Sequence, residues 1–441
     1  MPLPVAQRAL FDGFTSIPKA ALIKIAPVLV VLYLVRVYFQ GSSNGSERNM
    51  HGKVVMVTVS KIVLLGAPVF TDFLQGGTSG VGSEVVRGLA IRGAQIVLLT
   101  QDPVGDPFLV EYIDDMRATT GNDLITAEQV DLASLHSIRT FATKWIDNAP
   151  PRRLDMIILC ANTMTPRGGK LQSTEDGVEI MWGINYLANF HLLSILSPAI
   201  RAQPPDRDVR ILMGMCTSYI AGELPVHAER SDEDTNGSAK KSKKTASKTA
   251  ARKQSSTTFS PSAAYASSKL ALMTFALAFQ KHLSSYARPD KNPYNARVIL
   301  VDPGLTRTPG MRRYLSWGSI TGLLLYLVMY PFWWIVLKSP SMGAQSFLYA
   351  AMEAEYGRGE GGWLIQECGR TRIKRGEVQD EAVQKALWEY SEGMIQEAEK
   401  RGALARAEKK KKEAEVKAAE PAKSKGPEKK QPTSRRGRKA G

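Results

Sequence analysis

A tyrosine and a lysine four residues apart could share one proton. Tyr265 and Lys269 stand in the run YASSK, near the start of an apolar stretch of helical length. Residues four apart lie on the same face of a helix, so the two side chains would be neighbours. A nearby ammonium group lowers the pKa of a phenol from its usual value of about 10, which makes tyrosine a usable proton donor and acceptor. A tyrosine and a lysine at this spacing are common by chance, so the pair indicates catalysis only if other motifs accompany it.

A glycine-rich turn is one such motif. GGTSGVG at 76–82 precedes a helix-like run at 83–93 and a strand-like run, IVLL, at 96–99. Glycine lets the backbone approach a phosphate closely, and a helix N-terminus favours an anion. Plain turn glycines are the alternative. The candidate dinucleotide-binding residues of this turn are Gly76, Thr78, Ser79, Gly80 and Gly82.

The strand that should lead directly into this turn stands too early in the chain. GKVVMVT at 52–58 has the composition of a strand, yet 17 residues separate Thr58 from Gly76. Joining Thr58 to Gly76 restores TGGTSGVG, an uninterrupted strand, turn and helix. Residues 59–75 therefore look inserted.

The content of the segment 59–75 suggests its origin. The codons available to its first pair, Val-Ser, resemble the start of an intron, and its last residue, Gln75, can be encoded by an intron end. Thr-Asp at 71–72 can encode a branch point, and 17 codons keep the reading frame. We hypothesise that the segment is a translated intron. A genuine loop, or a slipped first strand at 62–65, are the alternatives.

Short apolar runs alternate with helical stretches from about residue 53 to 312. Runs of strand length occur at 156–159, 210–215 and 296–304, and a helical pattern occupies 135–148. This alternation predicts an α/β fold with a doubly wound parallel sheet.

With these elements in order, the chain resembles the short-chain dehydrogenase/reductase family, in its membrane-associated retinol-dehydrogenase-like branch. The resemblance covers about 52–375, apart from two insertions. The family's TGxxxGxG matches Thr58 and the turn glycines, and its YxxxK matches Tyr265 and Lys269. Further matches are Asp131 in VDLAS, Ala161 and Asn162 in LCAN, Asn185 in INYLANFHLL, Pro303 and Gly304 in DPG, and Thr308.

The resemblance implies a Rossmann-like fold and hydride transfer between a nicotinamide and a substrate carbonyl or alcohol carbon. Tyr265 would move the proton, and Lys269 would bind the nicotinamide ribose and tune Tyr265. Asn185 would hold a relay water, Thr308 would touch the nicotinamide amide, and Asp131 would lie near the adenine. A helix cap for Asp131 and a helix-interior polar group for Asn185 are the alternatives.

Two departures from the family pattern concern the ends of the fourth and fifth strands. Asn162 stands where the family has a glycine, which we attribute to the tolerance of asparagine for positive φ. The family's paired serines align with Met215-Cys216, and Thr217-Ser218 follows. We expect Ser218, and after it Thr217, to polarise the substrate carbonyl, and Cys216 stays open for the same position.

The end of the second strand decides between the two nicotinamide cofactors. An acidic residue there would bind a ribose hydroxyl group and a basic one a 2′-phosphate. Thr100 and Gln101 at this position are neither acidic nor basic, and the acidic Asp102 follows the discriminating position. We favour NADP(H), because the resembling branch often uses it, and NAD(H) stays open.

The net charge of +16 is concentrated in two stretches. Residues 401–441 hold 15 Lys or Arg and 5 Asp or Glu. Residues 229–258 hold 8 Lys or Arg and 4 Asp or Glu. The remaining chain is nearly neutral, so we expect no nucleic-acid partner. Residues 229–260 have the composition of a disordered loop, and 376–441 that of a charged helix followed by a disordered basic tail. The 3 cysteines exclude a disulfide framework, and we expect no metal site.

Two apolar segments predict contact with a membrane. Residues 20–39 contain an uninterrupted run of only 11 residues between Lys24 and Arg36, so 1–50 would be an uncleaved anchor and linker that spans or lies in the membrane plane. A buried core helix is the alternative. The segment 314–337 has no charged residue and is broken by Pro331. We expect it to re-enter or lie on the surface, because the strand-like run at 361–369 must join the same sheet.

Together these features predict a membrane-associated NAD(P)(H)-dependent oxidoreductase with its catalytic domain, 51–375, facing the cytosol from the endoplasmic reticulum or a lipid droplet. Its substrate would be a lipophilic alcohol or carbonyl of retinoid, steroid or long-chain type. The alternative is a catalytically impaired homologue that acts as a membrane-associated binding or scaffold protein. The interrupted glycine turn and Met215-Cys216 favour that alternative.

Overall fold

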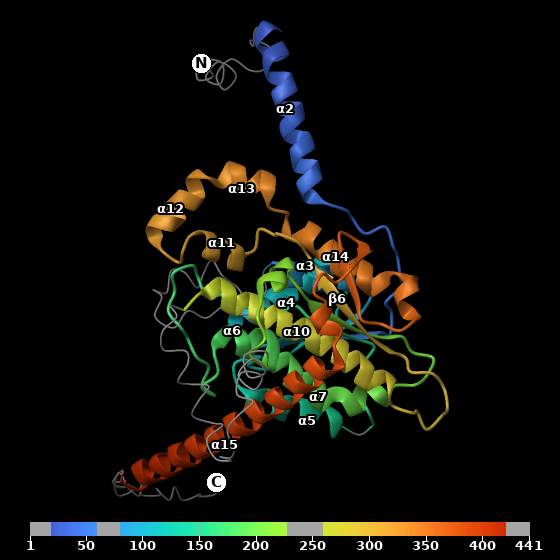
Figure 1. Ribbon diagram of the computed structural model, residues 1–441, viewed down its shortest axis with the longest axis vertical. Helices are drawn as coiled ribbons and strands as arrows, with labels where there is room; N and C mark the ends of the chain where they lie inside the picture. The colour runs from blue at the N-terminus through green and yellow to red at the C-terminus, as the bar shows by residue number, and fades with distance from the viewer. Residues whose placement is uncertain (1–18, 60–79, 149, 227–258, 420–441) are drawn as a thin grey trace, which may run out of the picture. The chain divides into compact units, whose positions relative to one another are not determined.

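The computed structural model describes residues 19–59, 80–148, 150–226 and 259–419 (Figure 1). Several predictions lie outside these residues. They concern Gly76, Thr78 and Ser79, the inserted segment beyond residue 59, most of the loop 229–260, the first 18 residues and the basic tail beyond residue 419.

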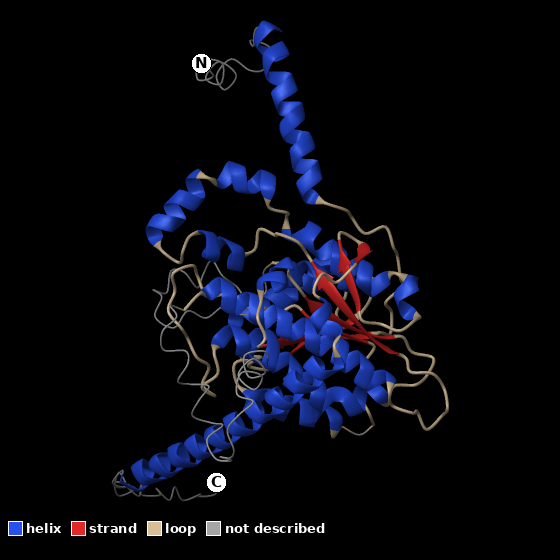
Figure 2. Cartoon of the chain, viewed as in Figure 1, coloured by secondary structure: helices blue, strands red, loops and turns tan. Residues whose placement is uncertain are grey.

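Eight strands form a single sheet in the order β3-β2-β1-β4-β5-β6-β7-β8, with helices on both sides (Figure 2). The neighbours from β3 to β7 are parallel, and β8 is antiparallel to β7. The strands are β1 Val54–Thr58, β2 Gln95–Thr100, β3 Ile125–Gln129, β4 Met156–Leu159, β5 Val209–Gly214, β6 Ala296–Asp302, β7 Trp363–Gln366 and β8 Gly369–Thr371. The strand order reverses between β1 and β4, and folds of this kind bind ligands at that point, beyond the carboxyl ends of the strands.

The sheet is buried on both faces, as parallel sheets are. Along β1, Val54 and Met56 pack into one hydrophobic core, and Val55 and Val57 pack into the other. The first core is completed by α5 Leu135–Ile146, α7 Ala188–Arg201 and α10 Pro261–Ser284, and the second by α3 Val81–Ala90, α4 Pro107–Thr120 and α14 Pro340–Met352. The predicted doubly wound, Rossmann-like α/β fold is confirmed.

The first strand ends where the sequence predicts. β1 pairs with β2 from Val54 to Thr58 and with β4 from Val55 to Thr58. The alternative of a slipped first strand at 62–65 is therefore wrong. The remaining short elements are α6 Ile180–Trp182, the π-helix η3 Gly183–Leu187, and the 3₁₀ helices η4 Thr217–Ala221, η6 Ala354–Gly357 and η7 Gly376–Gln379.

Between β6 and α14 the chain makes a long excursion that starts and ends at one place. The backbone N–H of Lys338 donates to the carbonyl of Leu305 at 2.9 Å, and the N–H of Arg307 donates to the carbonyl of Lys338 at 2.8 Å. The excursion contains α11 Pro309–Leu315, α12 Ile320–Val328 and α13 Tyr330–Val336 (Figure 1). Pro331 stands in the first turn of α13, where a proline fits. We call residues 305–338 the apolar excursion.

The N-terminal helix α2 Lys19–Gln40 contains Pro27 and exposes its apolar side chains from Val28 to Phe39. It contacts α13, and the Arg36 guanidinium lies over the Trp334 ring. Within the described ranges, none of the helices combines the length and apolar character that crossing a bilayer requires. A spanning anchor is therefore not confirmed.

The chain divides into two compact units between Glu399 and Lys400, inside α15 Glu381–Ala419. In the first unit, the start of α15 buries Val383, Leu387 and Ile395 in the same core as α7 and α10. The predicted domain boundary at 375 thus precedes apolar residues that belong to this core. In the second unit, the described residues continue as helix to Ala419.

Candidate active site

A cavity lies at the carboxyl ends of β1, β4, β5 and β6, at the point where the strand order reverses. Its walls come from segments far apart in the sequence. Of the residues singled out from the sequence, the cavity brings together Thr58, Gly80, Gly82, Asn162, Tyr265, Lys269, Pro303, Gly304 and Thr308. Other lining residues, which the sequence reasoning missed, include Cys160, Met164, Leu305, Met311 and Phe347. Cys216, which the sequence left open beside Thr217 and Ser218 for the serine position, also lines the cavity.

Helix α10 carries the tyrosine and lysine, and both side chains are buried. The helix begins after Ser260, whose hydroxyl accepts the backbone N–H of Ala263. The Lys269 Nζ donates to the carbonyl of Gly214 at 2.9 Å, at the end of β5, and lies 5.8 Å from the centroid of the Tyr265 ring. The predicted pair thus shares one face of one helix.

Burial controls the proton affinities of this pair. It raises the pKa of Tyr265 above its usual range, and the neighbouring Cys216 raises it further, while a hydrogen bond from Asn162 lowers it less than burial raises it. Burial also lowers the pKa of Lys269 to about 8. The expected lowering of the tyrosine's pKa is therefore not found in this structure, because burial raises that pKa. A protonated Tyr265 is suited to donate a proton to a carbonyl oxygen.

Asn162 contributes its side chain rather than an unusual backbone. Its Nδ2 donates to the Tyr265 hydroxyl at 3.2 Å. Among the described residues, the positive φ values of non-glycine residues belong to Lys291, Trp317, Glu367 and Cys368, so the reason given above for an asparagine at this position is wrong. The preceding residue, Ala161, donates its N–H to the Thr58 hydroxyl at 3.1 Å, which joins the ends of β1 and β4.

Asn185 is fully buried in the π-helix η3, and such irregular turns are frequent at functional sites. Its Oδ1 accepts the N–H of Thr163 at 2.7 Å, and its Nδ2 donates to the carbonyl of Thr163 at 2.9 Å and to the Ser268 hydroxyl at 3.3 Å. The side chain therefore ties the loop after β4 to α10. Its role in holding a relay water stays a prediction.

Asp131 lies beside the end of β2. Its Oδ1 accepts the N–H of Ala133 at 2.8 Å, and its Oδ2 accepts from Gln101 Nε2 at 3.4 Å. Gln101 is one of the two residues at the cofactor-discriminating position. Asp131 is not among the residues that line the cavity, so its adenine contact stays a prediction.

The loop after β5 does not bring Ser218 to the cavity. Ser218 is absent from the lining residues, and within the described part of the chain its buried hydroxyl has no hydrogen-bond partner. Thr217 donates its hydroxyl to Asp302 Oδ2 at 2.9 Å. The position of Cys216 directly after β5 was the signal that could have singled out this residue.

The described half of the glycine turn fits a dinucleotide. Gly80 has a φ of 91° and caps α3 without a side-chain hydrogen bond, which leaves the helix N-terminus open to the cavity. A Cβ on Gly80 would stand 3.4 Å from the Thr308 side chain. The Oδ1 of Asn162 is buried without a partner among the described residues. An open helix N-terminus and unpaired polar atoms suit a pyrophosphate and a nicotinamide ribose. The fold and the site define a dinucleotide-dependent α/β oxidoreductase.

No protein-family model matches the chain. An uncharacterised oxidoreductase of Schizosaccharomyces pombe, pbr1, is 39% identical over 377 residues, which are 86% of this chain and 90% of that protein. The polyprenol dehydrogenase of Mus musculus is 31% identical and covers 74% of this chain and 84% of its own length. Retinol dehydrogenase 13 of Mus musculus is 28% identical, and the match covers 82% of this chain and 89% of that protein.

A solved structure of an uncharacterised protein from Mycobacterium paratuberculosis has the same fold, with a TM-score of 0.50 and 20% identity over 81% of this chain and 98% of that one. The chain belongs to the short-chain dehydrogenase/reductase family and to its retinol-dehydrogenase-like branch. It is an NAD(P)-dependent oxidoreductase.

Proposed function

We propose that this oxidoreductase interconverts a lipophilic alcohol and its carbonyl at the surface of the endoplasmic reticulum membrane or a lipid droplet, with NADP(H) as the favoured cofactor. The observation that carries the proposal is the apolar excursion. Leu305, Thr308 and Met311 at its start line the cavity, and its middle exposes Ile320 and Val328 to the extent of 80% and 74%. One segment therefore connects the reaction site to an exposed apolar surface.

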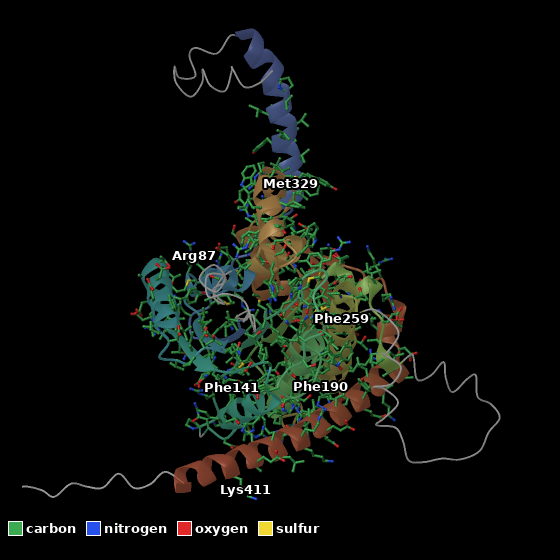
Figure 3. All side chains as sticks on the ribbon, turned by 90° about the vertical axis from the view of Figure 1, so that its left-hand side faces the viewer. Arg87, Phe141, Phe190, Phe259, Met329 and Lys411 are labelled. Carbon is green, nitrogen blue, oxygen red and sulfur yellow. The ribbon has the colours of Figure 1, made fainter. Side chains whose placement is uncertain are left out.

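That surface is continuous with part of α2. Helices α13 and α2 are in contact, and Figure 3 shows the side chains around Met329 beside α2. We call the exposed apolar side chains of both segments the lipid-facing surface, and they include Leu32, Leu34, Val35, Ile320, Leu324, Leu325, Leu327, Val328, Phe332 and Trp334. Contiguous exposed apolar patches mark interaction sites, and helices of this kind can lie in a lipid interface without spanning it.

Two relatives bear names that point to the same substrate class. Retinol and polyprenol are both long apolar alcohols, and the enzymes named for them share 28% and 31% identity with this chain. We extend the class of substrate, and not either compound, to this chain.

The residues of the cavity would bind the cofactor and transfer the proton. The N-terminus of α3 with Gly80 would hold the pyrophosphate, and Lys269 would hold the nicotinamide ribose. The bound nicotinamide supplies the hydride chemistry. Tyr265 would donate its proton to the carbonyl oxygen during reduction and accept it during oxidation, and Asn162 would orient the Tyr265 hydroxyl. Among the described residues, Met215-Cys216 is the departure that favours the impaired alternative, and the presence of Tyr265, Lys269 and Asn162 at one cavity opposes it.

The test compares membrane binding and substrate choice in the full chain. Ile320→Asp with Val328→Asp should lower co-flotation with phosphatidylcholine liposomes by about tenfold, because charge opposes burial in lipid. Phe108→Asp on α4 is the matched control, since Phe108 is 71% exposed but lies outside the lipid-facing surface. The double variant should also raise KM for all-trans-retinal presented in liposomes and leave KM for a small soluble aldehyde unchanged. Equal flotation of all three proteins would contradict the membrane proposal.

The cofactor preference has its own measurement. We expect NADPH to bind more tightly than NADH in a fluorescence titration, because Thr100-Gln101 presents no carboxylate to repel a 2′-phosphate. Tighter NADH binding would reverse the preference and leave the reaction class unchanged.

A further inference from the structure

Three side chains after β5 could face a substrate carbonyl, and the structure separates them. Thr217 commits its hydroxyl to Asp302 at 2.9 Å. Ser218 lies off the cavity with a buried hydroxyl. Cys216 lines the cavity together with Tyr265 and Lys269. Of the three side chains, Cys216 is therefore the one that lines the cavity together with Tyr265, the proton donor.

We propose that the Cys216 thiol is the second hydrogen-bond donor to the substrate oxygen, beside the Tyr265 hydroxyl. The inference rests on the proposed function, because it assigns a role in carbonyl reduction. Cys216 and Tyr265 line the same cavity, and the Cys216 thiol is one of the groups that raise the pKa of Tyr265.

The backbone holds Cys216 in place through the sheet. The N–H of Met215 donates to the carbonyl of Val301 at 2.7 Å, which continues the pairing of β5 with β6, and Cys216 itself is extended with φ −154° and ψ 143°. The next residue, Thr217, is tied to Asp302, and the other Asp302 oxygen accepts the N–H of Gly304 at 2.8 Å. Asp302 therefore couples the Cys216 loop to the loop that begins the apolar excursion.

A thiol in this place changes the chemistry in a definite direction. It is a weaker hydrogen-bond donor than a hydroxyl, so it stabilises developing negative charge on the substrate oxygen less well. It is also less costly to remove from water, which suits a cavity wall that contains Met164, Met311 and Phe347. The thiol would thus lower the rate and favour an apolar substrate.

The kinetic test uses the full chain in detergent micelles with NADPH and all-trans-retinal. We expect Cys216→Ala to lower kcat by about tenfold, Cys216→Ser to give at least the wild-type kcat, and Ser218→Ala to change kcat by less than about twofold. KM for NADPH should stay the same in all three. An unchanged kcat in Cys216→Ala, or a large loss confined to Ser218→Ala, would overturn the proposal.

A chemical test separates a role at the reaction site from a structural one. Iodoacetamide should modify Cys216 in the free chain, and NADPH with retinal should protect it, as measured by the mass of the peptide that carries it. Cys160 is the internal control, because burial raises the pKa of its thiol to about 12 and should leave it unmodified. Equal modification of Cys216 with and without NADPH and retinal would overturn the proposal.

Different results would contradict the proposed function and the proposed role of Cys216. A wild-type chain that binds NADPH but reduces neither retinal nor another lipophilic aldehyde contradicts the proposed function. In that case protection of Cys216 by NADPH alone still supports its place at the nicotinamide, and absence of protection contradicts it.

Discussion

The Nδ2 of Asn162 lies 3.2 Å from the hydroxyl oxygen of Tyr265. The residue after β4 thus touches the proton donor on α10, although 103 positions separate the two in the chain. Because this hydrogen bond is donated to the phenol oxygen, it stabilises the phenolate and opposes the effect of burial on the tyrosine's pKa.

Asn162→Ala should raise the pKa of Tyr265 further. In alcohol oxidation the phenolate must accept a proton, so the alkaline rise of kcat/KM should move to higher pH. At a fixed pH below that rise, the loss should be about fivefold, which corresponds to one hydrogen bond of about 1 kcal/mol. Tyr265→Phe is the control, and it should abolish the pH dependence together with the activity. A profile that stays in place in Asn162→Ala would show that the contact is not used.

Lys269 should make cofactor binding sensitive to alkaline pH. Its pKa is lowered to about 8, so the neutral amine predominates above that pH and the charged donor is lost as pH rises. The dissociation constant for NADPH, measured by fluorescence, should therefore increase from pH 7 to pH 9.5. Lys269→Met should bind NADPH more weakly and show a flat profile over the same range. A flat profile in the wild-type chain would contradict the assignment of Lys269 to the ribose.

Asp208 should matter for stability without touching the cavity. Its carboxylate accepts hydrogen bonds from Arg48 at 2.8 Å and from Arg210 at 2.7 Å, and the Arg210 side chain is 1% exposed. Asp208→Ala leaves the buried Arg210 guanidinium without its carboxylate partner, which should cost about 3 kcal/mol in the free energy of unfolding.

The control for this prediction is Asp114→Ala, since Asp114 pairs with Arg117 on the surface of α4 and should cost less than about 1 kcal/mol. Both changes are measured by urea denaturation in the presence of detergent. Similar losses in the two variants would refute the importance of burial. Burial raises the pKa of Asp208, but the hydrogen bonds and positive charges of Arg210 and Arg48 together lower it more, so the stabilisation should decline as pH falls through the lowered pKa.

The segment 59–75 should be dispensable. Val59 N–H donates to the carbonyl of Leu99 at 2.9 Å, and both Val59 and Gly80 line the cavity. Val59 thus continues the pairing of β1 with β2, and Gly80 at the start of α3 lines the same cavity. A chain that joins Thr58 to Gly76 should fold and bind NADPH at least as tightly as the full chain, because the complete glycine turn would follow β1 directly.

Two measurements decide the matter for residues 59–75. The masses of proteolytic peptides covering Lys53 to Arg87 in protein from its native source show whether the segment is present. A peptide that joins Thr58 to Gly76 supports the translated-intron hypothesis, and peptides that retain Val59 to Gln75 contradict it. Loss of NADPH binding in the shortened chain would show that the segment is a functional loop.

Features that depend on short stretches of chain could be predicted from the sequence. Tyr265 and Lys269 share a helix face because their spacing is set within one helix, and β1 ends at Thr58 because its apolar run ends there. Features that depend on packing could not. The choice between Cys216 and Ser218 follows from how the loop after β5 lies against Asp302, and a hydroxyl-bearing residue type misled the sequence reasoning.

The pKa of Tyr265 could not be predicted from the sequence either, because it also depends on packing. A Tyr–Lys pair taken alone predicts a lowered phenol pKa, but burial raises the pKa of Tyr265, Cys216 and Asp302 raise it further, and the hydrogen bond from Asn162 lowers it less. The extent of burial belongs to the completed fold. The contact of Asn162 with Tyr265 likewise joins two elements that no local pattern connects.

The backbone bonds between Leu305, Arg307 and Lys338 have an evolutionary consequence. Because the excursion departs from and returns to one point beside β6, its length and composition can change without disturbing the pairing of β6 with β7. Its part beyond Met311, which contains α12 and α13, does not line the cavity. Related enzymes can therefore differ in this part, and so in the membranes and substrates they use, while they inherit the same dinucleotide-binding residues.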